Sequence, residues 1–132
     1  MRDNYFLQKR LVQIWTEFFP DVPKLNEVSI IFKGKAKWKF GHIESQGKNT
    51  RIVLNRLFRS QIVPQYIIDL TIAHELVHYA HGFHSPLPKK YKYPHQGGIV
   101  KKELNKRGFK ELQKLEHKWF KTEWTHLYDV LR

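Results

Sequence analysis

The chain has 132 residues, of which 41% are hydrophobic, and it contains no cysteine. This length predicts one domain over residues 1–132 with one core, and the lack of cysteine excludes disulfides, thiolate catalysis and cysteine-ligated zinc. Lys and Arg number 24 against 12 Asp and Glu, a net charge of +12, which favours a polyanionic partner such as nucleic acid. No transmembrane run of ~18 apolar residues and no secretory signal is seen, so we expect a cytoplasmic monomer without a membrane partner.

The first predicted element is an N-terminal helix over residues 4–19. Its apolar side chains recur at helical spacing, and Asp3 or Asn4 can cap its start. Pro20 follows the last turn and stops the helix.

Three strands are predicted next. Residues 27–32 alternate apolar and polar side chains, and residues 36–44 begin with the same alternation. The second strand would be apolar on one face and basic on the other, so that Lys33, Lys35, Lys37 and Lys39 line one side of a hairpin. Residues 51–54 predict a third strand after a turn at residues 46–49.

Helices are predicted for the second half of the chain. Pro64 suits the start of a helix over residues 65–81, which is apolar almost all round and is therefore expected to be central and buried. Residues 83–95 predict a loop. Helical spacing resumes at 98–106 and again at 109–131, the latter predicting one long C-terminal helix. This order of elements predicts a small domain of the α+β class.

The motif HELVH, at residues 74–78, is the clearest chemical signal in the chain. Positions i and i+4 share one face of a helix, so His74 and His78 present two imidazoles to one point, as a tetrahedral zinc ion requires. Glu75 lies about 100° round the helix, beside the metal. Because zinc lowers the pKa of a bound water toward ~7, Glu75 can take up the proton of that water, and the pattern predicts peptide hydrolysis. The alternative is a pair of hydrogen-bonded core histidines.

A third metal ligand is needed, and three histidines are available. His81 lies one turn beyond His78, which suits the rim of the site. His84 has the third-ligand spacing of long-motif zinc peptidases. His95 stands just before the next predicted helix, whose start can hold a ligand rigidly. The residues alone leave His84 and His95 open.

The ordered set of segments RIVLNRLF, PQYIIDLTIAHELVHYAHG and PHQGGIVKKELNKRGF resembles the SprT-like metallopeptidases, the group that includes Spartan. It is also similar to the related YgjP-like and WLM peptidases. The resemblance covers roughly residues 28–107 and rests on the order of a strand, a helix with HELVH, a loop and a histidine before a helix.

This resemblance implies a minimal zincin of the gluzincin type, with one Zn²⁺ ion held by His74 and His78 and with Glu75 as the catalytic base. The third ligand of the SprT-like pattern corresponds to His95, whereas that of the YgjP-like pattern, HELxHxxHxxHS, corresponds to His84. We therefore expect His95, with His84 as the alternative. The resemblance also implies cleavage of proteins bound or crosslinked to DNA, and thus a role in DNA–protein crosslink repair.

Two lysine-rich segments are expected to contact DNA, with single-stranded DNA favoured. Lysines bind phosphate and tyrosines stack on unpaired bases. The residues concerned are Lys35, Lys37, Lys39, Lys89, Lys90, Tyr91 and Lys92. The alternative is a solvated basic rim. A peptide substrate is expected to pair with a strand edge at residues 36–44 or 51–54.

Three functions compete at this point. The first is a zinc endopeptidase that acts on proteins near DNA. The second is a general cytoplasmic zinc peptidase without DNA coupling, in which the positive charge has another cause. The third is a non-catalytic, zinc-stabilised module that binds nucleic acid and keeps HELVH for folding.

Overall fold

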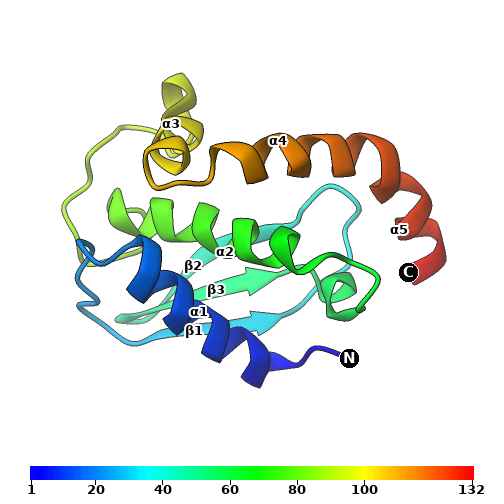
Figure 1. The fold of residues 1–132 in the computed structure, drawn as a ribbon. Coiled ribbons are helices and arrows are strands. Elements are labelled where there is room, and N and C mark those ends of the chain that lie inside the picture. Colours follow the sequence, from blue (N-terminus) through cyan, green and yellow to red (C-terminus); the bar gives the residue numbers. More distant parts are fainter.

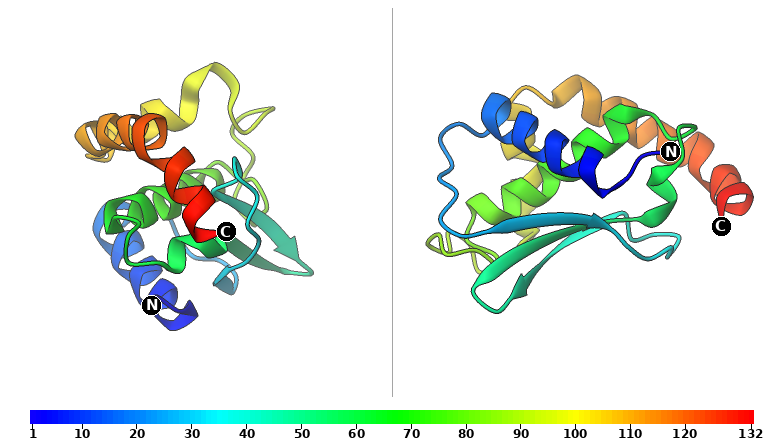
Figure 2. Two further views of the ribbon diagram at one scale, coloured as in Figure 1. Left: turned by 90° about the vertical axis from the view of Figure 1, so that its right-hand side faces the viewer. Right: turned by 90° about the horizontal axis from the view of Figure 1, so that it is seen from below.

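The computed structural model describes residues 1–132 and shows a three-stranded mixed sheet with helices packed on one of its faces (Figures 1 and 2). The strands are β1 (Val28–Phe32), β2 (Gly41–Gln46) and β3 (Asn49–Leu54). In the sheet β3 lies in the middle, parallel to β1 and antiparallel to β2. The predicted α+β class is therefore confirmed.

Alternate residues of the sheet point toward the helices, as the two-residue period of a strand requires. Ile30, Ile43 and Ile52 are aligned across the three strands and are buried. Ser29 and Arg51 have the opposite parity and lie on the face that no helix covers (Figure 2, right). The core is therefore confined to one side of the sheet.

Helix α1 (Asn4–Phe18) packs against β1 and α2. The carboxylate of Asp3 accepts a hydrogen bond from the backbone N–H of Phe6 at 2.8 Å, which satisfies one of the free donors at the helix start. The helix ends just before Pro20. The expected element is confirmed, and of the two candidate caps, Asp3 and Asn4, the structure has Asp3.

Helix α2 (Gln65–Ala80) is the centre of the molecule, since the sheet and α1 pack against it from one side and α3 and α4 from the other (Figures 1 and 2). Pro64 occupies its N-cap position with an extended backbone, one residue before the expected first turn. Twelve of its 16 residues are buried, which explains its nearly continuous apolar composition. No helix of the protein combines the length and apolarity that a bilayer crossing requires.

The expected long helix over residues 109–131 is helical from Lys110 to Leu131, but a π-helical turn lies in its middle. After η2 (Gln96–Gly98) and α3 (Ile99–Lys106), the chain forms α4 (Lys110–Trp119), the π-helical turn η3 (Phe120–Trp124) and α5 (Thr125–Leu131). Trp119 and Trp124 are five residues apart and both buried, with ring centroids 5.7 Å apart. The i to i+5 repeat of a π turn brings two residues at this spacing to the same side of the helix. The period of an α-helix would place them on different sides.

The expected strand over residues 36–44 is wrong for its first half, because residues 33–40 form no strand. Since β1 pairs with β3 and β2 lies on the far side of β3, this segment must cross the end of the sheet (Figure 1). Its carbonyls are bound by side chains instead of a strand: Asn55 donates to Ala36 and Lys39, and Trp124 Nε1–H donates to Lys37 at 2.7 Å. The lysines of residues 33–39 therefore do not line one side of a hairpin.

Candidate functional site

Helix α2 holds three of the expected site residues in fixed positions. His78 and Glu75 are both 4% exposed, and His74 is half-buried. They lie in the last two turns of the helix, whose apolar residues pack on every side. The helix thus presents two imidazoles and a carboxyl without help from any loop, because their spacing alone sets their direction.

His95 comes to the same place from the segment between α2 and α3. The segment turns back over the end of α2: a Cβ on Gly82 would lie 2.4 Å from the carbonyl oxygen of Pro88, and the N–H of Lys90 donates to the carbonyl of His81. His95 itself is exposed, and it is followed by Gly97 and Gly98, both with left-handed φ (58° and 66°). Only glycine adopts this backbone without strain, so the two glycines let the chain turn sharply from His95 into α3.

The three histidines converge through their Nε2 atoms. Nε2 of His95 lies 3.2 Å from Nε2 of His74 and 3.1 Å from Nε2 of His78. All three candidate ligand atoms lie within 4.8 Å of one another, close enough to hold one metal ion. Since Nε2 of His95 carries either one N–H or one lone pair, it cannot form a full hydrogen bond with both neighbours at once.

The imidazoles are held in the neutral form that binds metals. Burial, and next the charge of His95, lowers the pKa of His74 to about 4. Burial, and next the charges of His74 and His95, lowers the pKa of His78 to about 3. Both rings are therefore uncharged at neutral pH, and a neutral imidazole can bind a cation through a ring nitrogen. The Nδ1 atom of His78 is buried with no partner.

Glu75 lies beside this cluster without a partner of its own. Its carboxyl forms no hydrogen bond or ion pair, and burial raises its pKa to about 8. A carboxyl with a pKa near neutrality, in reach of the reacting groups, is suited to general acid–base work. The strand β2 comes very close here: a Cβ on Gly41 would lie 2.7 Å from Cγ2 of Thr71 and 3.3 Å from Oε2 of Glu75.

His84 and His81, the other two candidate ligands, lie apart from the cluster. His84 has a left-handed φ of 53°, and its Nδ1 lies 3.1 Å from Oγ of Ser45 in the β2–β3 hairpin. His81 is 2% exposed, with Nε2 3.7 Å from a carboxylate oxygen of Glu103 on α3. The structure thus brings His95, and neither of these, to the two histidines of α2.

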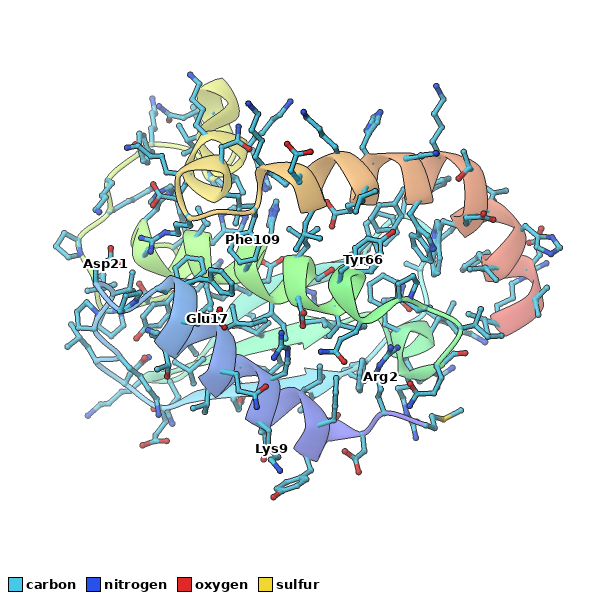
Figure 3. All side chains as sticks on the ribbon, in the orientation of Figure 1. Arg2, Lys9, Glu17, Asp21, Tyr66 and Phe109 are labelled. Carbon is cyan, nitrogen blue, oxygen red and sulfur yellow. The ribbon has the colours of Figure 1, made fainter.

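A cleft of about 370 Å³ opens next to Glu75. We call it the Glu75 cleft. Four parts of the chain line it: α2, the segment 33–40, the start of β2 and the C-terminal helices. The lining residues are, in that order, Thr71, His74 and Glu75; Trp38, Lys39 and Phe40; Gly41; and Glu116 and Phe120. The rings of Phe40 and Phe120 are 4.0 Å apart and join two of its walls. Figure 3 shows the side chains of Tyr66 and Phe109 between α2 and α4.

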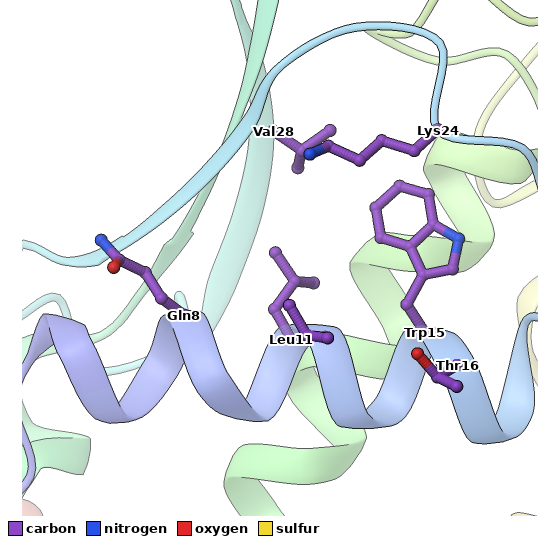
Figure 4. Close-up of a pocket in the computed structure, with 7 residues that line it drawn as sticks. Gln8, Leu11, Trp15, Thr16, Lys24 and Val28 are labelled. Atoms are coloured by element: carbon purple, nitrogen blue, oxygen red, sulfur yellow. The ribbon is translucent and has the colours of Figure 1, made fainter.

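A second hollow lies between α1 and β1 and carries no such chemistry. It measures about 500 Å³ and is lined mainly by Leu11, Val12, Trp15 and Val28, with Lys24 at its edge (Figure 4). It contains no histidine and no carboxylate. Size therefore does not single out a site here, whereas converging titratable groups do.

The lysines expected to contact DNA are divided between two surfaces. Lys35, Lys37 and Lys39 lie on the segment 33–40, and Lys89, Lys90 and Lys92 are exposed on the segment after α2. None of the six forms an ion pair. Tyr91 is half-buried, with its ring edge-on to His81 at 4.9 Å between centroids, whereas Trp38 is 63% exposed.

Sequence reasoning did not include Gly41 or Glu116 in the site. No local pattern reveals that Gly41 lies against Glu75, because this contact depends on how β2 packs on α2. Glu116 did leave a signal: with Leu112 and Phe120 it forms an i, i+4, i+8 series, which places one acidic residue on an otherwise apolar stripe.

Comparison of the chain with models of known protein families, with curated proteins and with solved structures finds no match. The activity proposed below therefore rests on the residues of this chain.

Proposed function

We propose that this protein is a zinc-dependent endopeptidase of the zincin type, as its resemblance to the SprT-like metallopeptidases implies. The observation that carries the proposal is the convergence of His74, His78 and His95 beside the unpaired carboxyl of Glu75. Two of these histidines are neutral at physiological pH, and the carboxyl lies at the edge of an open cleft.

Two of the three nitrogen spacings, those from His95, are close to the spacing in a zinc site. Ligand nitrogens about 2.0–2.1 Å from a tetrahedral zinc ion lie roughly 3.3 Å from one another. The Nε2 atom of His95 lies 3.1 and 3.2 Å from those of His78 and His74, which is close to this value. Three imidazole donors also favour zinc over harder cations such as Mg²⁺ or Ca²⁺, which prefer oxygen ligands.

When bound, zinc would polarise the peptide carbonyl and acidify water. Glu75 accepts the proton of the attacking water and returns it to the leaving amine, which converts a poor leaving group into a neutral one. A cation held by His74 and His78 would stabilise the carboxylate form of Glu75 and would oppose the effect of burial on its pKa. The two histidines would thus hold the metal and, through it, lower the pKa of the base.

The substrate would lie along the free edge of β2. This strand is at the edge of the sheet and contacts α2, and its first residue, Gly41, borders the Glu75 cleft. An extended peptide can add to such an edge through main-chain hydrogen bonds. Residues 51–54 cannot serve, because β3 is paired on both sides.

Cleavage of an unfolded protein substrate tests the proposal. Zinc-loaded protein is expected to cut it, chelation to stop cleavage, and added zinc to restore it. Glu75→Gln is expected to retain one equivalent of zinc and to lose activity by ~10²–10⁴-fold, the usual contribution of a general base. His84→Ala serves as control and is expected to keep both zinc and activity.

Two outcomes would contradict the proposal. Full cleavage by Glu75→Gln would exclude Glu75 as the base. Stoichiometric zinc without cleavage of any peptide by the wild type would favour the non-catalytic, zinc-stabilised module.

We further propose that cleavage is coupled to DNA binding, and the segment 33–40 supports this part of the proposal. Trp38 is exposed between Lys37 and Lys39, with the ammonium of Lys37 5.6 Å from its ring centroid. Exposed aromatic rings among lysines are suited to single-stranded nucleic acid, because bases stack on the ring while phosphates contact the lysines. The site and this segment share the Glu75 cleft, so DNA bound here would hold an attached protein near Glu75.

The salt dependence of DNA binding distinguishes a DNA-coupled peptidase from a general peptidase. Binding of a single-stranded oligonucleotide is measured over a series of salt concentrations for the wild type and for the triple variant Lys35→Ala, Lys37→Ala, Lys39→Ala. The loss of three phosphate contacts lowers the slope of log K against log salt by about 2. The matched control removes the same charge from exposed positions of α4, by Lys110→Ala, Lys114→Ala and Lys118→Ala. Equal effects of the two variants would exclude a specific role for the segment 33–40.

A further inference from the structure

The Glu75 cleft contains a second carboxyl that the proposed hydrolysis does not use. Glu116 projects from α4 into the cleft, opposite the segment 33–40 and beside His74 and Glu75. It is half-buried, and it forms neither a hydrogen bond nor an ion pair. The chain has 24 basic residues against 12 acidic ones, yet none of them pairs with this carboxyl.

The walls around Glu116 are aromatic. Phe120 lies one helical turn beyond Glu116 and packs against Phe40, while Trp38 stands 63% exposed at the mouth. Two hydrogen bonds from the C-terminal helices hold the segment 33–40, which carries Trp38, in place. Trp124 Nε1–H donates to the carbonyl of Lys37, and Tyr128 Oη–H donates to the carbonyl of Lys35. The cleft is therefore a formed recess.

Aromatic faces and a free carboxylate together suit an organic cation. The π-face of an aromatic ring attracts ammonium and guanidinium groups, and a carboxylate binds them by charge-assisted hydrogen bonds. Burial raises the pKa of Glu116 to about 7, and a cation bound beside this carboxyl would lower that pKa by stabilising the carboxylate. Lys39 also lines the cleft, but it is exposed and makes no ion pair with Glu116.

We infer that Glu116, with Trp38 and Phe120 as walls, is a specificity-determining residue that binds a cationic group of the substrate next to the scissile bond. This inference rests on the proposed peptidase function. The cation is an ammonium or guanidinium, and it has two possible sources: the side chain of a Lys or Arg residue, or the free α-amine of a substrate whose N-terminus enters the cleft. Glu116 selects the substrate; Glu75 remains the base.

A matched peptide series tests the inference. The peptides share one sequence and differ at a single position beside the scissile bond, which holds Lys, Arg or the uncharged norleucine, each with a free or an acetylated N-terminus. The wild type is expected to show kcat/KM about 10-fold higher for the cationic peptides, an effect carried mainly by KM. If Lys and Arg peptides are preferred over the norleucine peptide whether or not the N-terminus is acetylated, the cation is the side chain; if free N-termini are preferred over acetylated ones whichever residue is present, the cation is the α-amine.

Glu116→Gln keeps the shape of the residue and removes the charge. This variant is expected to reduce the preference for cationic peptides to about 1, with a far greater loss on the Lys and Arg peptides than on the norleucine peptide. Trp38→Ala, at an exposed position where truncation does not disturb the core, is expected to reduce the preference in part. The matched control is Glu111→Gln on the same helix, whose carboxylate is 80% exposed and outside the cleft, and it is expected to keep the wild-type ratio.

The inference fails if the wild type does not distinguish cationic from neutral peptides, or if Glu116→Gln affects all of them equally. A binding measurement separates this failure from failure of the peptidase proposal. Fluorescently labelled peptides of the same series are titrated with Glu75→Gln protein and followed by anisotropy. If binding shows a preference for cationic peptides that depends on Glu116, the inference is supported even when no peptide is cut. Cleavage without any preference for cationic peptides overturns the inference and leaves the peptidase proposal intact.

Discussion

The candidate metal centre joins two regions of very different construction. Helix α2 presents His74 and His78 from the most buried part of the protein, where packing on all sides fixes the backbone. The segment 83–98 presents His95 at an exposed position, before two glycines with left-handed φ. We infer a division of labour, in which α2 would provide a rigid pair of ligands and the segment would add a third ligand to a bound ion. The predictions below follow from this contrast.

The largest expected effect concerns the ligands themselves. His78→Ala removes one of the two preorganised ligands and should lower zinc affinity by more than ~100-fold, beyond the loss usual for outer-shell partners. His95→Ala leaves the pair on α2 intact and should lower zinc affinity by about 10-fold less than His78→Ala, because the rigid ligands lose little entropy on binding. Competition with a chromophoric chelator measures both affinities. The contrast would be broken if the two variants bound zinc equally well.

Zinc should stabilise the protein and should order the segment 83–98 more than α2. At a free zinc concentration about 100 times Kd, linkage adds ~2.7 kcal/mol to the free energy of unfolding. Amide hydrogen exchange should slow in the segment 83–98 on zinc addition, whereas the centre of α2 should be protected already in the metal-free protein. Uniform protection of the two regions without zinc would contradict this prediction.

The metal-free protein should lose stability as the pH rises above about 6.5. Burial raises the pKa of Glu75 from 4.5 to about 8, so the folded state holds a proton that the unfolded state has released, and stability is lost between these values as the pH rises. His74 and His78 have pKa values lowered from 6.5, so their contribution is lost as the pH falls below 6.5, and the two effects oppose each other between pH 4.5 and 6.5.

Glu75→Gln isolates the carboxyl part of this pH dependence. One retained proton corresponds to ~1.4 kcal/mol per pH unit, or roughly 2 kcal/mol between pH 6.5 and 8. The variant should therefore lose most of this slope in urea titrations of metal-free protein, and the slope that remains comes from Glu116, whose pKa burial raises to about 7. An unchanged slope would mean that Glu75 is ionised in the folded state without metal.

The smallest expected effect concerns the turn behind His95. Gly97→Ala places a Cβ in open space but forces a strained left-handed φ of 58°, which costs on the order of 1 kcal/mol. Because this strain opposes the turn that presents His95, zinc affinity should fall about 5-fold. The matched control is Gly108→Ala, also at a left-handed φ and also in open space, but between α3 and α4. It should lower stability without a change in zinc affinity.

Much of the fold and half of the site could be predicted from local patterns. Helix α1, the turn into β3 and the buried character of α2 followed from side-chain periodicity, because each pattern is set within one element. The spacing of His74 and His78 required the same side of a helix for the same reason. The alternation at residues 36–40 led to the wrong prediction of a strand there. Alternation does not reveal that side chains of Asn55 and Trp124 bind this backbone in place of a neighbouring strand.

The sequence by itself therefore determined which chemical groups α2 offers: two imidazoles on one side and a carboxyl beside them, fixed by the helical period. Only the tertiary structure decided that His95 approaches them and His84 does not, since both lie on the same connecting segment and differ in where that segment turns. It alone also placed Glu116 and Trp38 in one cleft with Glu75. The physical reason is that such contacts join elements far apart in the chain, and packing of the whole core sets their distance.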